Sequence, residues 1–399
     1  MKIKICIIGL GDVGLPVFLK LSSKFDTIGY DINKKRINEL KSGLDRNLEF
    51  SKKDLKPKKK LKFTDQIDFA KNCNFFIITV PTPIFTNKKP DLSHIINATK
   101  SVADVIKKND IIFIESTIYP GVTEEICVPI IEKSTNLKSN KNFFIGYSSE
   151  RINPGDTIHS IGKIPKVLSF NTNNKIISNK ILKVYKILSS KIILSKSIKA
   201  AEMSKLLENT QRDINIAFFN EIKIICSSLN ISFEEVIKLA KTKWNFIKFN
   251  PGLVGGHCLP VDPYYLSYIA KKFNVSSNVT LAGRKTNDYM VDFYYKKIIK
   301  KLNNSSKKLL LIGLTYKENV PDFRNSLSLK LFYKLNKKNK NIYAYDPYIK
   351  NLDKKNKNIL KTINNVNKFN YAVHLVKHTL TEKLFKKNKN VEVINLNVL

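Results

Sequence analysis

The chain has 399 residues, a length that favours two or three domains, each with a core of its own. Hydrophobic residues make up 43% and aromatic residues 10%, which fits a globular protein and excludes a disordered one. The formal net charge of +37 invites a nucleic-acid partner, but the cations are 64 Lys and only 6 Arg, spread along the whole chain. Because Arg is the residue suited to bidentate contacts with phosphates and bases, we expect a solvated lysine surface and no nucleic-acid partner.

Five cysteines, at positions 6, 73, 127, 226 and 258, show neither a CxxC pair nor the spacing of metal ligands. This usage predicts a reducing compartment, no disulfide framework and no metal site. The N-terminal apolar run is too short for a signal peptide, and no stretch of about 20 apolar residues occurs. We therefore expect a cytoplasmic protein with no membrane span.

The first segment carries a dinucleotide-binding pattern. Residues 3–8 are typical of a buried parallel strand, the glycines of Gly9–Gly14 follow in GxGxxG spacing, and residues 15–23 have a helical pattern. The next apolar run, 27–30, ends in Asp31. A strand before the glycines, a helix after them and an acid at the end of the second strand are the context that this fingerprint requires.

Each residue of the pattern has a physical task. Gly9 would make the turn, Gly11 would let a pyrophosphate approach, and Gly14 would allow close packing of helix on strand. Asp31 would accept hydrogen bonds from both ribose hydroxyls and repel a 2′-phosphate, which favours NAD over NADP. The NADP alternative rests on the cations close downstream, Lys34, Lys35 and Arg36.

Polar residues also follow three later strands, where open α/β sheets bind their ligands. The predicted strands cover residues 74–80, 111–114 and 143–147. The polar sets that follow are Pro81-Thr82-Pro83, Glu115-Ser116-Thr117 and Ser148-Ser149-Glu150-Arg151. Each set also has an ordinary interpretation, with Thr117 as a helix cap or Glu150 as a solvated acid.

Residues 199–229 have the pattern of a long helix, on which Glu202, Lys205, Asn209 and Arg212 share one face. A solvated polar stripe and a stripe that points into a cleft are equally compatible with this pattern. Further along, Gly255-Gly256-His257-Cys258 presents one thiol, with Asp262 four residues beyond it. A rigid loop with a thiol beside an acid suits covalent chemistry, although a turn with a buried cysteine has the same pattern.

The C-terminal part repeats the character of the first. Residues 303–308 are typical of a linker, 309–314 of a buried strand, and 342–346 echo the run that ends in Asp31. The loop after the first of these strands lacks GxGxxG and carries Lys317, Asp322 and Arg324, so it is expected to bind a phosphate or uronate rather than a dinucleotide, or to be a surface loop. The chain is thus expected to be an α/β protein with two Rossmann-like doubly wound domains joined by a long central helix. The expected bounds are 1–197, 198–302 and 303–399.

These segments resemble the UDP-glucose/GDP-mannose dehydrogenase family through nearly the whole chain and in the family's order. The matching segments are Gly9–Gly14, Val80–Pro83, Glu115–Thr117 with Pro120-Gly121, Ser149–Arg151, Ala201–Lys205 with Asn209, Gly255–Cys258, and Thr315–Lys317 to Arg324. Lys243–Phe246 running into Pro251–Cys258 is most similar to the branch that acts on UDP-N-acetylhexosamines, which includes enzymes of Vi-polysaccharide and O-antigen synthesis.

The resemblance implies an NAD-dependent oxidation of sugar C6 to the uronic acid through a thioester on Cys258, for surface polysaccharide synthesis. It implies that Lys205 and Asn209 stabilise the oxyanion, that Asp262 organises the water and Lys205, and that Glu150 and Thr117 activate or position water. His257 is expected to pack the loop. The implied cofactor contacts are Gly9, Gly11, Asp12, Val13, Gly14, Asp31, Arg36, Pro81, Thr82, Thr117 and Arg324. The implied substrate contacts are Glu150, Arg151, Lys205, Asn209, Gly255, Gly256 and Lys317.

By analogy, the long helix implies a homodimer. The sugar stays open between UDP-N-acetylglucosamine and UDP-N-acetylgalactosamine, with UDP-glucose and UDP-N-acetylmannosamine as alternatives. A two-electron NAD-dependent hydroxyacid dehydrogenase would share the first domain and a helix lysine. It would not need the thiol of the loop, which is why the loop disfavours it.

Overall fold

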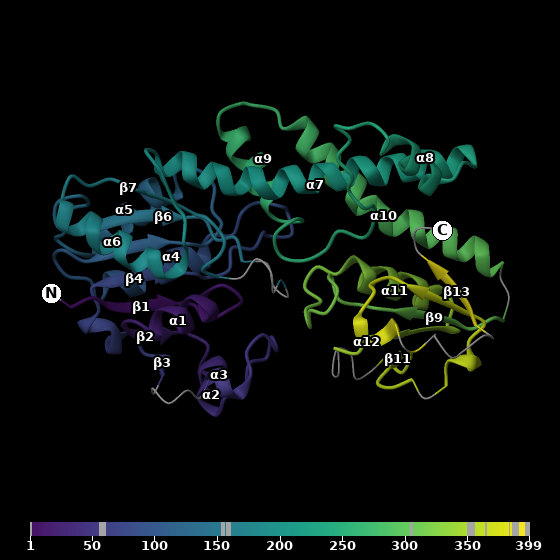
Figure 1. Ribbon diagram of the computed structural model, residues 1–399, viewed down its shortest axis with the longest axis horizontal. Coiled ribbons are helices and arrows are strands. Elements are labelled where there is room, and N and C mark those ends of the chain that lie inside the picture. The colour runs from purple at the N-terminus through teal and green to yellow at the C-terminus, as the bar shows by residue number, and fades with distance from the viewer. Residues whose placement is uncertain are drawn as a thin grey trace. The chain divides into compact units, whose positions relative to one another are not determined.

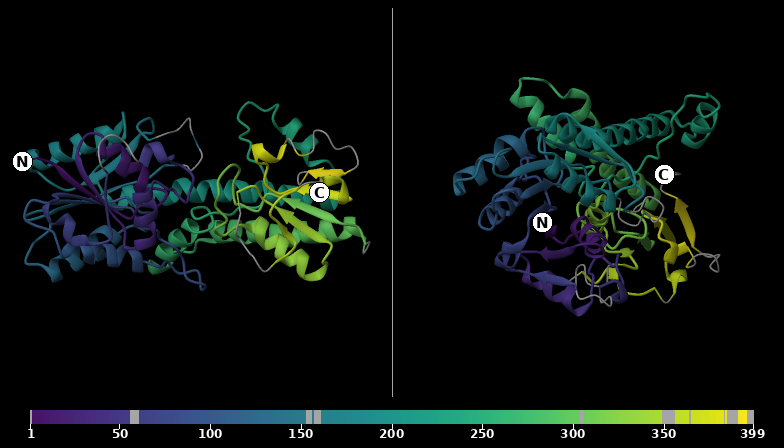
Figure 2. Two further views of the ribbon diagram at one scale, coloured as in Figure 1. Left: turned by 90° about the horizontal axis from the view of Figure 1, so that it is seen from below. Right: turned by 60° about the vertical axis from the view of Figure 1, so that its left-hand side comes forward.

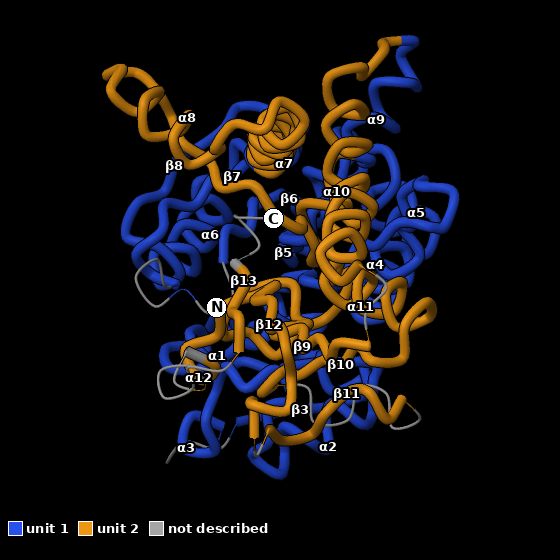
Figure 3. Tube along the Cα trace, turned by 90° about the vertical axis from the view of Figure 1, so that its right-hand side faces the viewer, with its two compact units in different colours: residues 1–208, 264–274 blue, residues 209–263, 275–399 orange. Residues whose placement is uncertain are grey.

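In a computed structural model of the chain, the buried apolar runs form two β-sheets, each in a unit of its own. The first unit comprises residues 1–208 and 264–274, and the second comprises 209–263 and 275–399 (Figure 3). The residues that the structure describes are 2–55, 61–152, 156, 161–303, 306–348, 356–363, 365–382, 384 and 391–395.

The sheet of the first unit has the strand order β3-β2-β1-β4-β5-β6-β7-β8 in the described residues. The strands are β1 Lys4–Ile8, β2 Asp26–Tyr30, β3 Lys62–Thr64, β4 Phe75–Ile78, β5 Ile111–Ile114, β6 Phe144–Ser148, β7 Lys166–Phe170 and β8 Ile192–Ser195. All neighbouring pairs are parallel except β6 with β7. The first six strands follow the order of a dinucleotide-binding sheet, with the reversal between β1 and β4.

Helices cover this sheet because successive strand side chains point to opposite faces. Ile5, Ile7 and Phe75 share one core with the apolar faces of α1 (Gly14–Ser22) and α6 (Lys175–Leu188). The α4 helix (Ser93–Ala103) packs against η2 (Val122–Cys127) and α5 (Val128–Ser134). The remaining helical segments are α2 Lys34–Ser42 and α3 Lys52–Leu55 (Figure 1), together with η1 Ile67–Asn72.

The long helix predicted over 199–229 is α7 (Ile198–Leu229), which is continuous in all views (Figure 2). The boundary between the two units falls within it, after Glu208. It is followed by α8 (Phe233–Ala240), α9 (Asp262–Lys272) and α10 (Asn278–Leu302). None of the helices in the described ranges combines the length and hydropathy needed to span a membrane.

The sheet of the second unit is parallel in the described residues, in the order β11-β10-β9-β12-β13. Its strands are β9 Leu309–Ile312, β10 Ile342–Tyr345, β11 Ile359–Leu360, β12 Tyr371–His374 and β13 Glu392–Asn395. Helices α10 and α11 (Leu327–Lys338) share a core with β9, β10 and β12, while η3 (Val366–Lys368) and α12 (Thr379–Glu382) complete the unit. The predicted fold class, two Rossmann-like domains and a long central helix, is confirmed.

Strands β7 and β8 were absent from the sequence-based expectations. β7 begins with a lysine and β8 has exposed apolar residues, so neither shows the continuous apolar run of a central parallel strand. This antiparallel extension matters for the site, because its first residue is Lys166.

Candidate active site

The glycine loop between β1 and α1 leaves room for a ligand at one glycine and none at another. Gly9 has a φ of +90°, and its N–H donates to the Tyr30 carbonyl at 2.8 Å. A Cβ on Gly14 would lie 1.8 Å from the Gly9 carbonyl oxygen, so only glycine fits there. A Cβ on Gly11 would meet nothing within 4 Å. An exposed Gly11 beside the N-terminus of α1 therefore fits the pyrophosphate of NAD.

The acid at the end of β2 holds this loop. Asp31 accepts from the Leu10 N–H at 2.8 Å through Oδ2 and from the Asn33 N–H at 2.8 Å through Oδ1. It remains half-buried, so its carboxylate is still accessible to ribose hydroxyls. Within the loop, Asp12 accepts from the Asn47 amide at 2.6 Å.

Arg36 lies beneath the loop rather than on the surface. Its side chain is 4% exposed, donates from Nε to the Leu10 carbonyl at 2.9 Å, and pairs through Nη1 with Asp45 at 2.9 Å. These contacts support the loop from within the protein. The direct cofactor contact expected of Arg36 stays a prediction.

The polar residues after β4 and β5 lie next to each other. The Ser116 hydroxyl donates to the Val80 carbonyl at 2.7 Å, which joins the two strand ends. Pro81 is exposed, and Thr82 and Thr117 are half-buried. The next helical segment along the chain is η2, and the backbone N–H groups at its start donate to a buried carboxylate. Glu202 of α7 accepts from the N–H of Gly121 at 2.6 Å and from that of Thr123 at 3.0 Å. Burial raises the pKa of Glu202 to about 7, although these hydrogen bonds oppose the rise.

Glu150, after β6, is a buried member of a charge cluster and not a solvated acid. It is 6% exposed, and its Oε2 accepts from Lys166 Nζ at 2.9 Å. The same ammonium contacts Glu115 at 2.8 Å. Burial would raise the pKa of Glu150, but Lys166 and the surrounding hydrogen bonds lower it below the ordinary value. Burial raises the pKa of Glu115 despite the same lysine.

Arg151, next to Glu150, is held by protein groups. Its guanidinium forms an ion pair with Glu208 of α7 and donates to the Pro165 carbonyl at 2.9 Å. The substrate contact expected of Arg151 also stays a prediction.

The polar stripe of α7 is mostly buried. Glu202, Lys205 and Asn209 are 0%, 9% and 7% exposed, whereas Arg212 is exposed. The Asn209 amide donates to the carboxylate of Asp262, the first residue of α9. This stripe is therefore not simply a solvated face, which the sequence pattern alone left undecided.

The thiol loop is shaped by its two glycines. A Cβ on Gly255 would lie 2.8 Å from the Asn325 carbonyl oxygen, and one on Gly256, where φ is +95°, would lie 2.8 Å from the Tyr316 ring. The Asn325 amide donates to the Gly256 carbonyl at 3.0 Å. Cys258 follows, and its carbonyl accepts from the Asp262 N–H at 2.9 Å. The thiol and the carboxylate therefore lie one turn apart at the start of α9.

Burial separates this thiol from the other four. Cys258 is half-buried, Cys6, Cys73, Cys127 and Cys226 are buried, and none of the five forms a disulfide. Burial raises the pKa of Cys73 and of Cys127 to about 12, and that of Cys6 well above its ordinary value. Because the thiolate is the nucleophile, Cys258 is the thiol best placed to react.

The loop after β9 carries the two cations expected there. Lys317 is half-buried, while Arg324 is exposed and pairs with Asp322. The Tyr316 N–H donates to the Asp322 carbonyl at 3.0 Å, which closes the loop. Asp322 also lies 3.7 Å from His257, which agrees with a packing role for that histidine.

The second sheet has a carboxylate in the same position as Asp31 of the first, but here a histidine covers the carboxylate. Asp346 accepts from the Leu314 N–H at 2.6 Å, as Asp31 does from Leu10. Here, however, the buried His378 lies over the carboxylate, with Nε2 at 3.0 Å from Oδ2. His378 Nδ1 accepts from the Asn319 N–H at 3.0 Å, so Nε2 carries the proton. Burial would raise the pKa of Asp346, but His378 and the backbone N–H groups lower it.

A buried polar network fixes the chain just before the thiol loop. Asn220 of α7 donates to the Gly252 carbonyl at 3.1 Å and accepts from its N–H at 2.8 Å. Asn220 also donates to Asn287 of α10, which donates to Asp213 at 2.8 Å. Asp213 pairs with the buried Arg284 at 2.6 Å.

The structure thus collects the predicted residues in two sets. The first unit holds the glycine loop, Asp31 and the strand-end residues, and the second holds Asn209, Asp262, the thiol loop and the loop after β9. Sequence reasoning missed Lys166, His378 and Asn220. The one signal that pointed to a buried charge is a lysine that opens a mostly apolar pentapeptide, Lys166–Phe170.

Three consecutive stretches match domains of one family. Residues 3–189 match the NAD binding domain of the UDP-glucose/GDP-mannose dehydrogenase family, 199–289 its central domain, and 310–394 its UDP binding domain.

Two similar proteins of known sequence and one solved structure cover most of the chain. The UDP-N-acetyl-D-glucosamine 6-dehydrogenase of Salmonella typhi is 45% identical over 354 residues, which cover 87% of this chain and 83% of that protein. Protein CapL of Staphylococcus aureus is 43% identical over 87% of this chain and 82% of its own length. The structure of the UDP-D-ManNAc dehydrogenase from Pyrococcus horikoshii superposes with a TM-score of 0.85 at 30% identity, covering 98% of this chain and 95% of that one.

Proposed function

The chain belongs to the UDP-glucose/GDP-mannose dehydrogenase family and is an NAD-dependent UDP-sugar 6-dehydrogenase, and we propose that its substrate is a UDP-N-acetylhexosamine. UDP-N-acetylglucosamine and UDP-N-acetylgalactosamine are the two candidates. Support comes from the stretch Lys243–Phe246 with Pro251–Cys258, and from relatives at 43–45% identity that are named UDP-N-acetyl-D-glucosamine 6-dehydrogenases. Relatives named UDP-N-acetyl-D-mannosamine dehydrogenases are 32–34% identical.

The proposed reaction uses Cys258 as a covalent nucleophile. Bound NAD supplies the acceptor for the hydride that leaves sugar C6 in each of two oxidations. After the first oxidation, the Cys258 thiolate adds to the aldehyde carbon and forms a C–S bond, and the second oxidation converts this adduct to a thioester. Water then breaks the C–S bond, which releases the carboxylate and restores the thiolate.

The observation that carries this proposal is the setting of Cys258. It is the one incompletely buried thiol of the chain, on a loop whose two glycines leave no room for a side chain, one turn before the buried Asp262. Asp262 in turn accepts from the Asn209 amide. An ordinary buried cysteine would not need this combination.

We assign the remaining groups by what each can donate or accept. Lys205 and the Asn209 amide would stabilise the oxyanion that develops at C6, with Asp262 orienting Asn209. Glu150 would take and return protons, and Thr117 would position water beside it. The pyrophosphate of NAD would bind at Gly11 to Gly14, and its ribose would bind at Asp31. The other contacts with the cofactor would come from Asp12, Val13, Pro81, Thr82 and Arg324.

We expect the substrate to contact two cationic side chains and the backbone of two glycines. Lys317 would bind the diphosphate or the developing uronate, and Arg151 would add a second charge. Gly255 and Gly256 would contact the sugar through backbone groups that the packing on Asn325 and Tyr316 leaves free. The division into NAD-binding residues 1–197, a central part 198–302 and a UDP-sugar-binding part 303–399 follows from these assignments.

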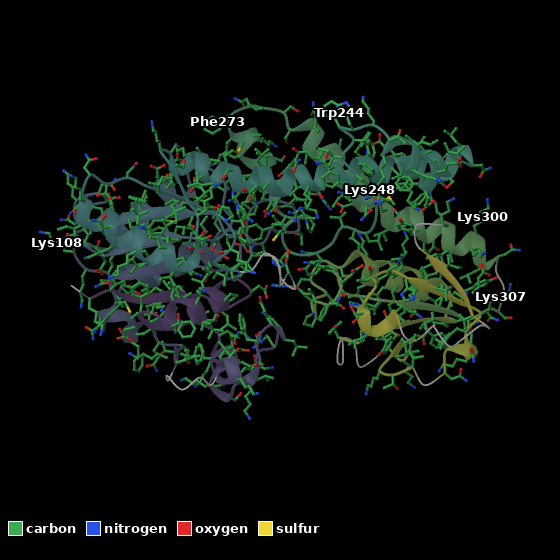
Figure 4. All side chains as sticks on the ribbon, viewed as in Figure 1. Lys108, Trp244, Lys248, Phe273, Lys300 and Lys307 are labelled. Carbon is green, nitrogen blue, oxygen red and sulfur yellow. The ribbon has the colours of Figure 1, made fainter. Side chains whose placement is uncertain are left out.

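We also propose that the protein is a homodimer through α7. Met203, Leu207, Phe218, Ile225 and Leu229 project from one side of this helix and are 42–63% exposed. Beyond the helix, Trp244 is 92% exposed (Figure 4). Exposed apolar side chains gathered on one side of a long helix are typical of an interface between subunits, and a two-fold dimer would bury the same side of both helices. The uronic acid product would serve surface polysaccharide synthesis.

An NADH-release assay over four UDP-sugars tests the substrate and the electron count together. We expect UDP-N-acetylglucosamine or UDP-N-acetylgalactosamine to react fastest, with two NADH formed for each sugar consumed. UDP-glucose or UDP-N-acetylmannosamine as the fastest substrate would contradict the sugar assignment. One NADH per sugar would instead refute the thioester route and favour a two-electron dehydrogenase.

A further inference from the structure

A buried charge cluster at the ends of β5 and β6 joins two carboxylates through one ammonium. Lys166 Nζ lies 2.8 Å from Glu115 Oε2 and 2.9 Å from Glu150 Oε2. The three side chains are 5%, 0% and 7% exposed, and the Ser148 hydroxyl lies 3.5 Å from the same nitrogen. The cluster would carry one net negative charge with all three groups ionised, in largely buried surroundings.

Both oxygens of Glu150 are fixed. While Oε2 accepts from Lys166, Oε1 accepts from the N–H groups of Arg151 at 2.7 Å and Ile152 at 2.6 Å. The carboxylate therefore cannot rotate without breaking several hydrogen bonds. Among the described residues, Lys166 is the one side-chain cation within ion-pair distance of it.

The groups around the lysine come from three elements, β5, β6 and α6. Glu115 follows β5, Ser148 and Glu150 belong to β6 and its end, and Tyr185 of α6 places its ring centre 5.7 Å from Lys166 Nζ. Arg151 is paired with Glu208, so its positive charge is already balanced by that carboxylate. Lys166 is therefore the cation that balances the buried negative charge of Glu150.

We propose that Lys166 is a positioning residue that keeps the Glu150 carboxylate ionised and oriented for the proton transfers of the UDP-sugar oxidation. The proposal rests on the proposed function of Glu150. A buried carboxylate without a cation is strongly biased toward its neutral form, in which it cannot accept a proton. Glu115, which lacks the two backbone N–H donors of Glu150, is the member of the cluster that takes up a proton first as the pH falls.

The test is the pH dependence of kcat in Lys166→Met and Lys166→Arg. Lys166→Met should move the acidic limb of the kcat profile upward by about one pH unit or more, so that kcat at pH 7 falls by about tenfold. Lys166→Arg keeps a cation that can reach both carboxylates, and its acidic limb should return toward the wild-type position. The Kd for NAD, measured by fluorescence titration, should stay within about twofold in both variants, because Lys166 is assigned no cofactor contact.

The double variant Lys166→Met/Glu115→Gln covers the possibility that Lys166→Met does not fold, since it removes the cation together with one of its two partners. Its acidic limb should also move upward, whereas that of Glu115→Gln alone should stay within about 0.3 pH units of wild type. A folded Lys166→Met or double variant with the wild-type profile would overturn the proposal. A wild-type protein that oxidises no UDP-sugar would instead refute the function on which the proposal depends.

Discussion

Five thiols are present in this chain, and their surroundings decide which of them can react. Desolvation raises the pKa of Cys6, Cys73 and Cys127, so these three remain protonated at neutral pH. Cys258 alone is half-buried, and it lies on a loop whose two glycines pack closely against Asn325 and Tyr316. Because the residue type is the same at all five positions, what separates Cys258 from the other four is its accessibility.

Cys258→Ala should reduce uronate formation by about a thousandfold or more, because no thioester can form. Release of uronate, followed by chromatography of the UDP-sugar product, measures the effect. Cys226→Ala is the matched control, as Cys226 is a buried thiol of the same unit with no assigned role, and it should retain the wild-type rate. Uronate formed by Cys258→Ala at the wild-type rate would remove the thiol from the mechanism.

Two glycines of the nucleotide loop should respond to alanine in different ways. Gly14→Ala places a Cβ 1.8 Å from a backbone oxygen and 2.4 Å from Thr79 Oγ1, so it should destabilise the first unit by about 3 kcal/mol. In Gly11→Ala the new Cβ contacts no protein atom within 4 Å, so the thermal midpoint should stay unchanged. The affinity for NAD should fall by about tenfold or more. Calorimetry and NAD titration of both variants separate the two effects. Unchanged NAD affinity in Gly11→Ala would argue against a pyrophosphate at that position.

Among the helices, α7 acts as a support for the loops around it. Glu202 holds the N–H groups of Gly121 and Thr123, Asn209 holds Asp262, and Asn220 holds Gly252. Each of these side chains is buried, so each contact forms in surroundings where an unpaired polar group is costly. Within each unit, the part of α7 that belongs to it thereby fixes nearby segments: Gly121 and Thr123 in the first unit, and Asp262 and Gly252 in the second.

Asn220→Ala should loosen the segment before the thiol loop. It removes two hydrogen bonds to Gly252 and leaves its N–H and carbonyl without those partners, which should cost about 1–3 kcal/mol and lower kcat by about tenfold. Steady-state kinetics should show a kcat loss larger than any change in the KM for NAD. The exposed neighbour Glu221→Ala serves as the control and should behave as wild type. A purely structural role for Asn220 would lower the thermal midpoint and leave kcat per folded enzyme intact.

For the assembled protein, the exposed apolar side of α7 predicts two chains per particle. Phe218→Asp places a charge on this side and should convert a particle of twice 45.7 kDa into one of 45.7 kDa. Light scattering after gel filtration measures the mass. Ile176→Asp, on the 69% exposed Ile176 of α6, is the matched control and should leave the mass unchanged. A wild-type mass of one chain would refute the dimer.

What could be predicted from the sequence was local in the chain. The glycine loop, its flanking strand and helix, and Asp31 lie within 31 residues, so their spacing alone defines the geometry. Lys166 could not be placed near Glu150 in this way, because their contact depends on the antiparallel pairing of β6 with β7. Helical periodicity placed Lys205, Asn209 and Arg212 on one side of α7, but it carries no information on where that side becomes exposed.

The covering of Asp346 by His378 has a consequence for how many dinucleotides one chain can bind. Both halves have an acid at the end of the second strand that accepts a hydrogen bond from the backbone after the first strand. In the N-terminal half the acid is still within reach of a ribose, whereas in the C-terminal half the imidazole has taken the place that a ribose would need. Equilibrium titration should therefore find a single dinucleotide per chain. Removing the ring by His378→Gly would not be enough to create a second site, because the glycines that admit a pyrophosphate are missing from that loop.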